Sequence, residues 1–142
     1  MSKIIEIALG EYGNIEIPGD ENNPEIMKYY HETGRTWVDS ETTPWCDAFM
    51  DWTVMKAGGQ PTPGLNARAW LDVGELVLDF NLTDNIIAVM WRGSPDGWQG
   101  HVAIPIRKTD SHLYLLGGNQ SDMVRISPYP INRLLGYRKI TI

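Results

Sequence analysis

Cys46 is the single cysteine of this 142-residue chain and its most reactive side chain. It follows Thr43 and Pro44, a capping residue and a proline of the kind that begin helices. In the first helical turn, unpaired backbone N–H groups and the helix dipole stabilise a thiolate and lower the pKa of the thiol. The position therefore predicts a nucleophile, although a lone cysteine is more often a small buried apolar residue.

A thiol nucleophile needs a base, and His101 is the best placed of the three histidines. It follows the polar, glycine-rich segment 92–100 and opens an apolar run, so we expect it at the mouth of a strand. His31 lies near the end of a predicted helix and His112 lies in a polar turn. We expect both of these on the surface.

A histidine base also needs a partner that fixes its tautomer and orientation. Asn119 follows the apolar run 113–116 and two glycines, so it should emerge at the end of the strand beside that of His101. Glycine and asparagine also favour turns, and a turn is the simpler interpretation of residues 117–120. Gln120, the next residue, is the alternative third member.

The elements that must position these residues change in character along the chain. Helices are predicted over 4–9 after Ser2, over 24–30 after Asn23, over 44–57 and, more briefly, over 66–71. In the third helix, an apolar face is expected to comprise Cys46, Phe49, Met50, Thr53 and Ala57. Strands are predicted over 86–91, 101–106, 113–116, 123–127 and 135–142. Helices first and closely spaced strands second indicate an α+β domain, with N-terminal helices packed on an antiparallel sheet of about five strands.

Composition narrows the possible functions. The net charge of −6 disfavours nucleic acid and anionic lipid as partners, and no apolar run is long enough to span a membrane. A single cysteine excludes an internal disulfide and a thiolate-rich metal site, and we expect no metal and no cofactor. We expect one monomeric catalytic domain over 1–142, made in the cytoplasm without a signal peptide.

Several stretches together resemble one family. They are residues 44–49, 91–102, 116–121 and 127–138, in that order, within a match that extends from about 23 to 138. They are similar to the CHAP-like and NlpC-like group of papain-fold peptidoglycan hydrolases, which occur in bacterial genomes and in phages. The chain departs from this pattern at residues 83–86, where relatives usually carry a Gly-Asp pair before the strand.

The resemblance implies a papain-like fold and a catalytic triad of Cys46, His101 and Asn119. It implies substrate contacts near Trp45, Trp98 and Gln120, and cleavage of an amide bond in bacterial peptidoglycan, as an amidase or a stem-peptide endopeptidase. The expected setting is a phage endolysin that reaches the cell wall through a lysis pore. The alternative setting is a secreted antibacterial effector that is paired with an immunity protein.

Two other classes of function compete with this interpretation. A non-catalytic module could bind the cell wall through tryptophans while Cys46 only packs. A zinc hydrolase could use the three histidines, but no two of them have the i, i+4 spacing of a helical zinc site.

Overall fold

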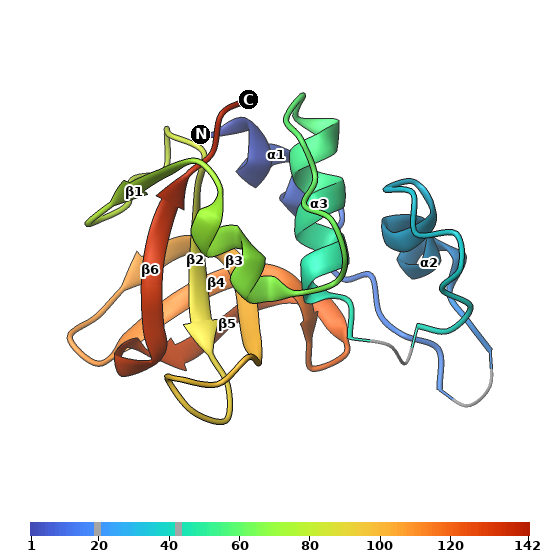
Figure 1. The fold of residues 1–142 in the computed structure, drawn as a ribbon. Helices are drawn as coiled ribbons and strands as arrows, with labels where there is room; N and C mark the ends of the chain where they lie inside the picture. Colours follow the sequence, from blue (N-terminus) through green and yellow to red (C-terminus); the bar gives the residue numbers. More distant parts are fainter. Residues whose placement is uncertain (19–20, 42–43) are drawn as a thin grey trace.

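The computed structural model describes residues 1–18, 21–41 and 44–142. In this part of the chain, helices α1 (Lys3–Leu9), α2 (Pro24–His31) and α3 (Cys46–Lys56) come first, followed by the 3-10 helix η1 (Ala67–Asp72). The strands are β1 (Glu75–Val77), β2 (Ile86–Trp91), β3 (Gly100–Lys108), β4 (His112–Gln120), β5 (Met123–Pro130) and β6 (Leu134–Lys139), with the short 3-10 helix η2 (Ile131–Arg133) before β6. Figure 1 shows the helices to one side of the sheet. The predicted α+β class is confirmed.

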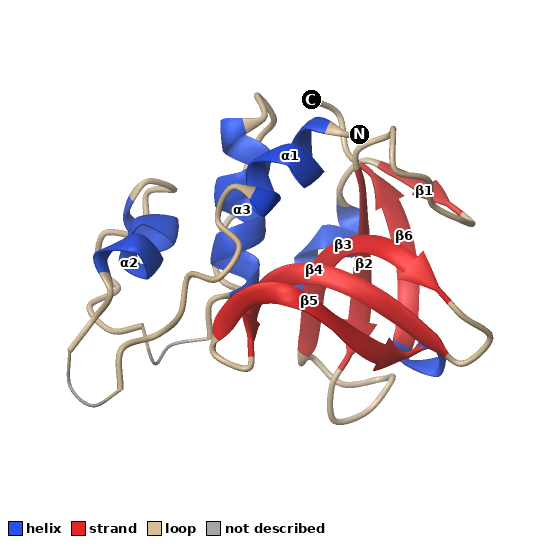
Figure 2. Cartoon of the chain, turned by 180° about the vertical axis from the view of Figure 1, so that it is seen from behind, coloured by secondary structure: helices blue, strands red, loops and turns tan. Residues whose placement is uncertain are grey.

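The described strands form one antiparallel six-stranded sheet in the order β1-β6-β2-β3-β4-β5. Strands β2 to β5 follow one another as a meander, as their short connections predicted, and β6 returns to lie beside β2. The edge strand β1 was not predicted, because its three residues are mostly exposed and carry no apolar alternation. Figure 2 shows β3, β4 and β5 curving together across the sheet.

Both faces of the sheet are apolar. Ile87, Val89 and Val102 pack with the helices in the larger core cluster. Alternate residues on β2, including Ala88 and Met90, pack in a second cluster on the other side. This double burial explains why the first five residues of β2 are all buried and why the sequence there has no polar alternation.

Helix α3 is buried on all sides. The five residues predicted to form an apolar face are all buried, and so is every other residue from Cys46 to Val54. The helix lies against β3 and β4, and both α1 and α2 also pack against it. Figure 1 shows α3 standing between the sheet and α2. A helix enclosed in this way has no solvent-facing side and needs no amphipathic pattern.

The helix starts follow their capping residues. The hydroxyl of Ser2 accepts from the N–H of Ile5 at 3.3 Å, and the amide oxygen of Asn23 accepts from the N–H of Glu25 at 3.0 Å. Helix α3 begins at Cys46, not at Pro44, and the predicted cap Thr43 lies outside the described residues. The segment predicted as a helix over 66–71 is a 3-10 helix one residue further on.

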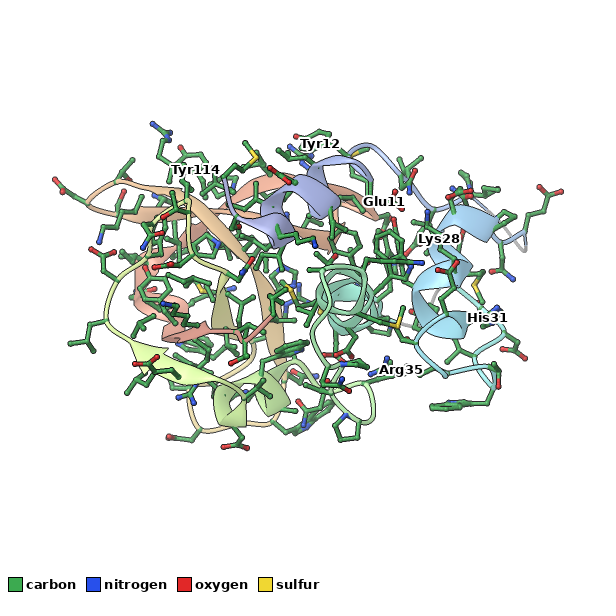
Figure 3. All side chains as sticks on the ribbon, turned by 90° about the horizontal axis from the view of Figure 1, so that it is seen from above. Glu11, Tyr12, Lys28, His31, Arg35 and Tyr114 are labelled. Atoms are coloured by element: carbon green, nitrogen blue, oxygen red, sulfur yellow. The ribbon has the colours of Figure 1, made fainter. Side chains whose placement is uncertain are left out.

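Helix α2 is held to the end of α1 by a charged cluster. The ammonium of Lys28 lies 2.5 Å from a carboxylate oxygen of Glu11, and the hydroxyl of Tyr29 donates to the same oxygen at 2.9 Å. Figure 3 shows Lys28 and Glu11 side by side where the two segments meet. None of the helices in the described residues is long and apolar enough to cross a membrane.

Two adjacent glycines of β4 lie in close contacts, Gly118 with the start of α3 and Gly117 with strand β3. A Cβ atom at Gly118 would lie 2.7 Å from the Cβ of Phe49 and 2.7 Å from the ring of Trp45. At Gly117 it would lie 2.7 Å from the Cβ of Ala103. The pair was predicted to form a turn, but both glycines lie within β4. Gly118 allows α3 to approach β4 closely at the helix start, where Cys46 lies.

Replacing Gly118 by Ala should therefore lower the free energy of unfolding by about 1–3 kcal/mol, because the added methyl meets the Cβ of Phe49 and a packed indole. Urea unfolding followed by tryptophan fluorescence measures the change. Gly136→Ala is the matched control, since a Cβ there meets only ordinary contacts of 3.7 Å or more. Equal stability of the two variants would contradict a close contact at Gly118.

Candidate active site

A cleft of about 340 Å³ opens at the start of α3. Its walls come from the residues before and at the helix start, from the segment that leads into η1, and from the loop between β2 and β3. They are Pro44, Cys46, Asp47, Leu65, Asn66, Ala67, Arg92, Trp98, Gln99 and Gly100. The cleft thus joins the predicted nucleophile to the loop that precedes His101.

Cys46 is the first residue of α3, and its side chain is only 5% exposed. Burial raises the pKa of the thiol, and this outweighs the lowering effects of Arg92 and of the backbone N–H groups of Val102 and Asp47. The helix terminus alone predicts a depressed pKa, but in this structure burial has the larger effect. The thiol rests in its protonated form and needs a base.

His101 lies at the start of β3 and is fully buried. Its Nε2 lies 2.7 Å from Oε1 of Gln120. The amide nitrogen of Gln120 donates to the carbonyl oxygens of Leu115 and Arg125, at 3.0 and 2.6 Å, so Oε1 must be the acceptor toward the ring. His101 therefore carries its proton on Nε2, which leaves the lone pair on Nδ1.

The ring is held from two further directions. The hydroxyl of Tyr129 lies 3.2 Å from Nε2 of His101, and the two rings stack with centroids 5.1 Å apart. Nη2 of Arg92 lies 3.2 Å from Nδ1. Burial and, after it, the Arg92 charge lower the pKa of His101 to about 4, so the imidazole is neutral near pH 7.

The structure pairs Gln120, not Asn119, with the imidazole. Asn119 lies in the same strand end with a positive φ of 56°, and Ser121 and Asp122 also have positive φ. The pairing of β4 with β5 shifts between Gly117 and Gln120, so side chains there do not alternate regularly. This irregularity turns Gln120 inward, where it is 2% exposed, bonded within the protein and not among the residues that line the cleft.

Asp47, next to Cys46 in the chain, belongs to a buried charged network. Its Oδ1 accepts from the indole N–H of Trp70 at 2.7 Å, and its Oδ2 lies 3.7 Å from the Arg35 guanidinium without a hydrogen bond. Arg35 also binds Asp51, whose Oδ1 accepts from the backbone N–H of Thr62 at 2.6 Å. Burial and then the neighbouring Asp51 raise the pKa of Asp47. The network anchors the first turns of α3.

The two tryptophans predicted to bind substrate have different environments. Trp45 is fully buried, stacks on Tyr29 and donates its indole N–H to Glu16 at 2.6 Å. It belongs to the core and does not line the cleft. Trp98 lines the cleft and is 74% exposed.

The other two histidines lie apart from this site. His31, labelled in Figure 3, lies on α2, on the far side of α3 from the sheet. His112 is exposed at the start of β4, where its ring pairs with the Ser111 hydroxyl at 2.8 Å. Across residues 1–18, 21–41 and 44–142, no group of three or more His, Cys, Asp or Glu side chains could hold a metal ion.

Among solved structures, the chain is similar to a protein from Staphylococcus aureus subsp. aureus Mu50, described as similar to lipoprotein and of the NLP/P60 family. The TM-score is 0.53 at 17% sequence identity, over 99% of this chain and 41% of the other. The chain has an NLP/P60-like fold. The papain-like α+β architecture expected from the sequence is thereby confirmed. No family model and no curated protein matches the sequence.

Sequence reasoning missed three residues of this site: Arg92, Tyr129 and Asp47. Arg92 stands directly after the apolar strand β2 and begins the loop that carries Trp98. A charged residue at the end of an apolar strand was a usable signal for a site residue. Tyr129 gave no signal, because it reaches His101 only through the curvature that brings β5 beside the ring.

Replacing Gln120 by Ala should disturb the ring of His101, because Nε2–H loses its acceptor and the neutral tautomer loses its support. Nitrogen-15 NMR of the imidazole measures the tautomer, and turnover should fall with it. Asn119→Ala is the matched control and should leave the ring signals unchanged. A tautomer shift in the Asn119 variant alone would assign the orienting role to Asn119.

The His101 ring should also remain neutral between pH 8 and pH 5. Burial and Arg92 both disfavour the imidazolium, so protonation should begin only as the pH approaches about 4. Carbon and nitrogen ring shifts recorded across this range test the prediction. A midpoint near 6.5, the value of an exposed histidine, would contradict it.

Proposed function

We propose that this protein is a cysteine hydrolase that cleaves an amide bond in bacterial peptidoglycan. The observation that carries the proposal is a cleft lined by Cys46, at the start of α3, and by Arg92, whose guanidinium contacts an imidazole that Gln120 orients. The NLP/P60-like fold supports the choice of a cysteine hydrolase. The cell-wall substrate rests on the family resemblance of the sequence.

In the proposed reaction, Nδ1 of His101 takes the proton of the Cys46 thiol, and Sγ attacks the carbonyl carbon of the amide. The backbone N–H of Asp47, in the first turn of α3, is a donor for the oxyanion. The imidazolium then protonates the leaving nitrogen, and the C–N bond breaks to give a thioester. Water, deprotonated by His101, releases the acid and regenerates the thiol.

The walls of the cleft suit a peptide attached to a glycan. Leu65 and Ala67 supply apolar surface beside Cys46, and the exposed ring of Trp98 at the rim offers a face for a sugar or a side chain. The proposed setting remains a phage lysin, with a delivered antibacterial effector as the alternative. In both settings another system brings the protein to the cell wall.

Cys46→Ala should abolish release of fragments from purified peptidoglycan while the circular dichroism spectrum stays native, because the thiol is the nucleophile and its loss removes only one small group. Mass spectrometry of the wild-type digest identifies which bond is cut.

His101→Ala should fall to a similar level, since a general base contributes about 10² to 10⁴ in rate. His112→Ala is the matched histidine control and should be fully active, because its ring is exposed at the other end of the meander. A folded Cys46→Ala variant that keeps more than a few per cent of activity would remove the nucleophile assignment. Wall binding without any fragments from the wild type would favour the binding module.

A further inference from the structure

Both nitrogens of the proposed base are occupied in this structure. Nε2 donates to Gln120, and Nδ1, the nitrogen with the lone pair, accepts from Nη2 of Arg92 at 3.2 Å. A guanidinium has only donors and does not lose its proton in proteins. While Arg92 is bound to Nδ1, His101 cannot take a proton from Cys46. Arg92 must leave Nδ1 before the proposed reaction begins.

Arg92 is a cation without an anionic partner. In the described residues, none of the ion pairs involves Arg92, although the chain as a whole carries a net charge of −6. The carboxylate in the same cleft, that of Asp47, is held by Trp70 and faces Arg35. An imidazole lone pair is a weak partner for a guanidinium compared with a carboxylate, which accepts two parallel hydrogen bonds and carries the opposite charge.

The backbone of Arg92 is fixed while its side chain reaches the cleft. Its N–H donates to the carbonyl of Gln99 at 3.2 Å, and its carbonyl accepts from Ser94 at 2.9 Å, so the loop between β2 and β3 holds the residue in place. The side chain is half-buried and lines the cleft together with Cys46. A long side chain on a fixed backbone can move from the imidazole to a ligand in that cleft.

We propose that Arg92 is a specificity-determining residue that binds a carboxylate of the substrate, and that this contact frees Nδ1 of His101 to accept the Cys46 proton. The inference rests on the proposed function for its substrate and names the chemistry of that substrate: an acyl group with a free carboxylate close to the scissile amide. Peptidoglycan stem peptides carry such groups, both at the C-terminal end of the peptide and on acidic residues.

The first test uses two alkylating reagents and needs no cell-wall substrate. Iodoacetate carries a carboxylate and iodoacetamide does not. Both react in the same way: Sγ of Cys46 bonds to the methylene carbon, iodide leaves, and the thiol proton passes to His101 or to the buffer. Cys46 is the single cysteine, so the rate reports on this site alone. In Arg92→Gln, the ratio of iodoacetate to iodoacetamide rates should fall about tenfold or more, the effect of losing a charged hydrogen bond.

Arg92→Lys keeps the charge but loses the planar fork, so its ratio should lie between those of the wild type and Arg92→Gln. Arg107→Gln is the matched control and should keep the wild-type ratio. Arg107 is exposed near the other end of β3, roughly 20 Å along the strand from His101. An unchanged ratio in folded Arg92→Gln would overturn the proposal.

The second test uses synthetic stem peptides in which each carboxylate is converted, one at a time, to a carboxamide. For the wild type, one of these conversions should lower kcat/KM at least tenfold, and the same conversion should have little effect on kcat/KM of Arg92→Gln. The peptide that shows this difference identifies the carboxylate that Arg92 binds. Equal cleavage of all the peptides by the wild type would overturn the proposal. If no peptide is cut at all, the proposed function fails, and the alkylation ratios still decide whether Arg92 binds a carboxylate.

Discussion

The close approach of α3 to strand β4 is the constraint on which the site depends. Gly118 leaves no Cβ atom between the strand and the helix, and Trp45 and Phe49 fill the space directly beside it. Cys46 lies between these two aromatic residues in the chain, so the same contact that completes the core also fixes the thiol beside β3. A larger residue at Gly118 would move the helix start and with it Cys46.

Buried charge restrains the same helix from its other side. Asp47 and Asp51 are a turn apart on α3, and the Arg35 guanidinium compensates both of them while it bonds to the loop that carries Thr62. Two buried carboxylates with one cation form a costly arrangement unless the geometry is well satisfied. Here the hydrogen bonds from Trp70 and Thr62 satisfy Oδ1 of each carboxylate, which ties η1 and the preceding loop to the helix start.

The electrostatic state of the cleft follows from burial. A fully buried imidazole and a thiol that is 5% exposed both favour their neutral forms, so the resting pair consists of a thiol and a neutral imidazole. Arg92 then supplies the positive charge that faces the cleft. Under the proposed function, this arrangement keeps the Cys46 thiol unreactive in water and makes its activation depend on what occupies the cleft.

The sequence by itself determined the helices with strong caps, most of the strands and the α+β class, because capping residues and the spacing of apolar residues are local features. It also singled out Cys46 and His101 as candidate site residues. Tertiary structure decided the rest. Whether Asn119 or Gln120 faces His101 depends on a register shift between β4 and β5, and a shift of one residue reverses the direction of a strand side chain. The burial of Trp45 depends on Tyr29 of α2 and on strand β4 packing against its ring. The contact of Arg92 with Nδ1 of His101 depends on how the loop after β2 returns to β3. The protonation states of the Cys46 thiol and the His101 imidazole depend on burial, which no local sequence pattern encodes.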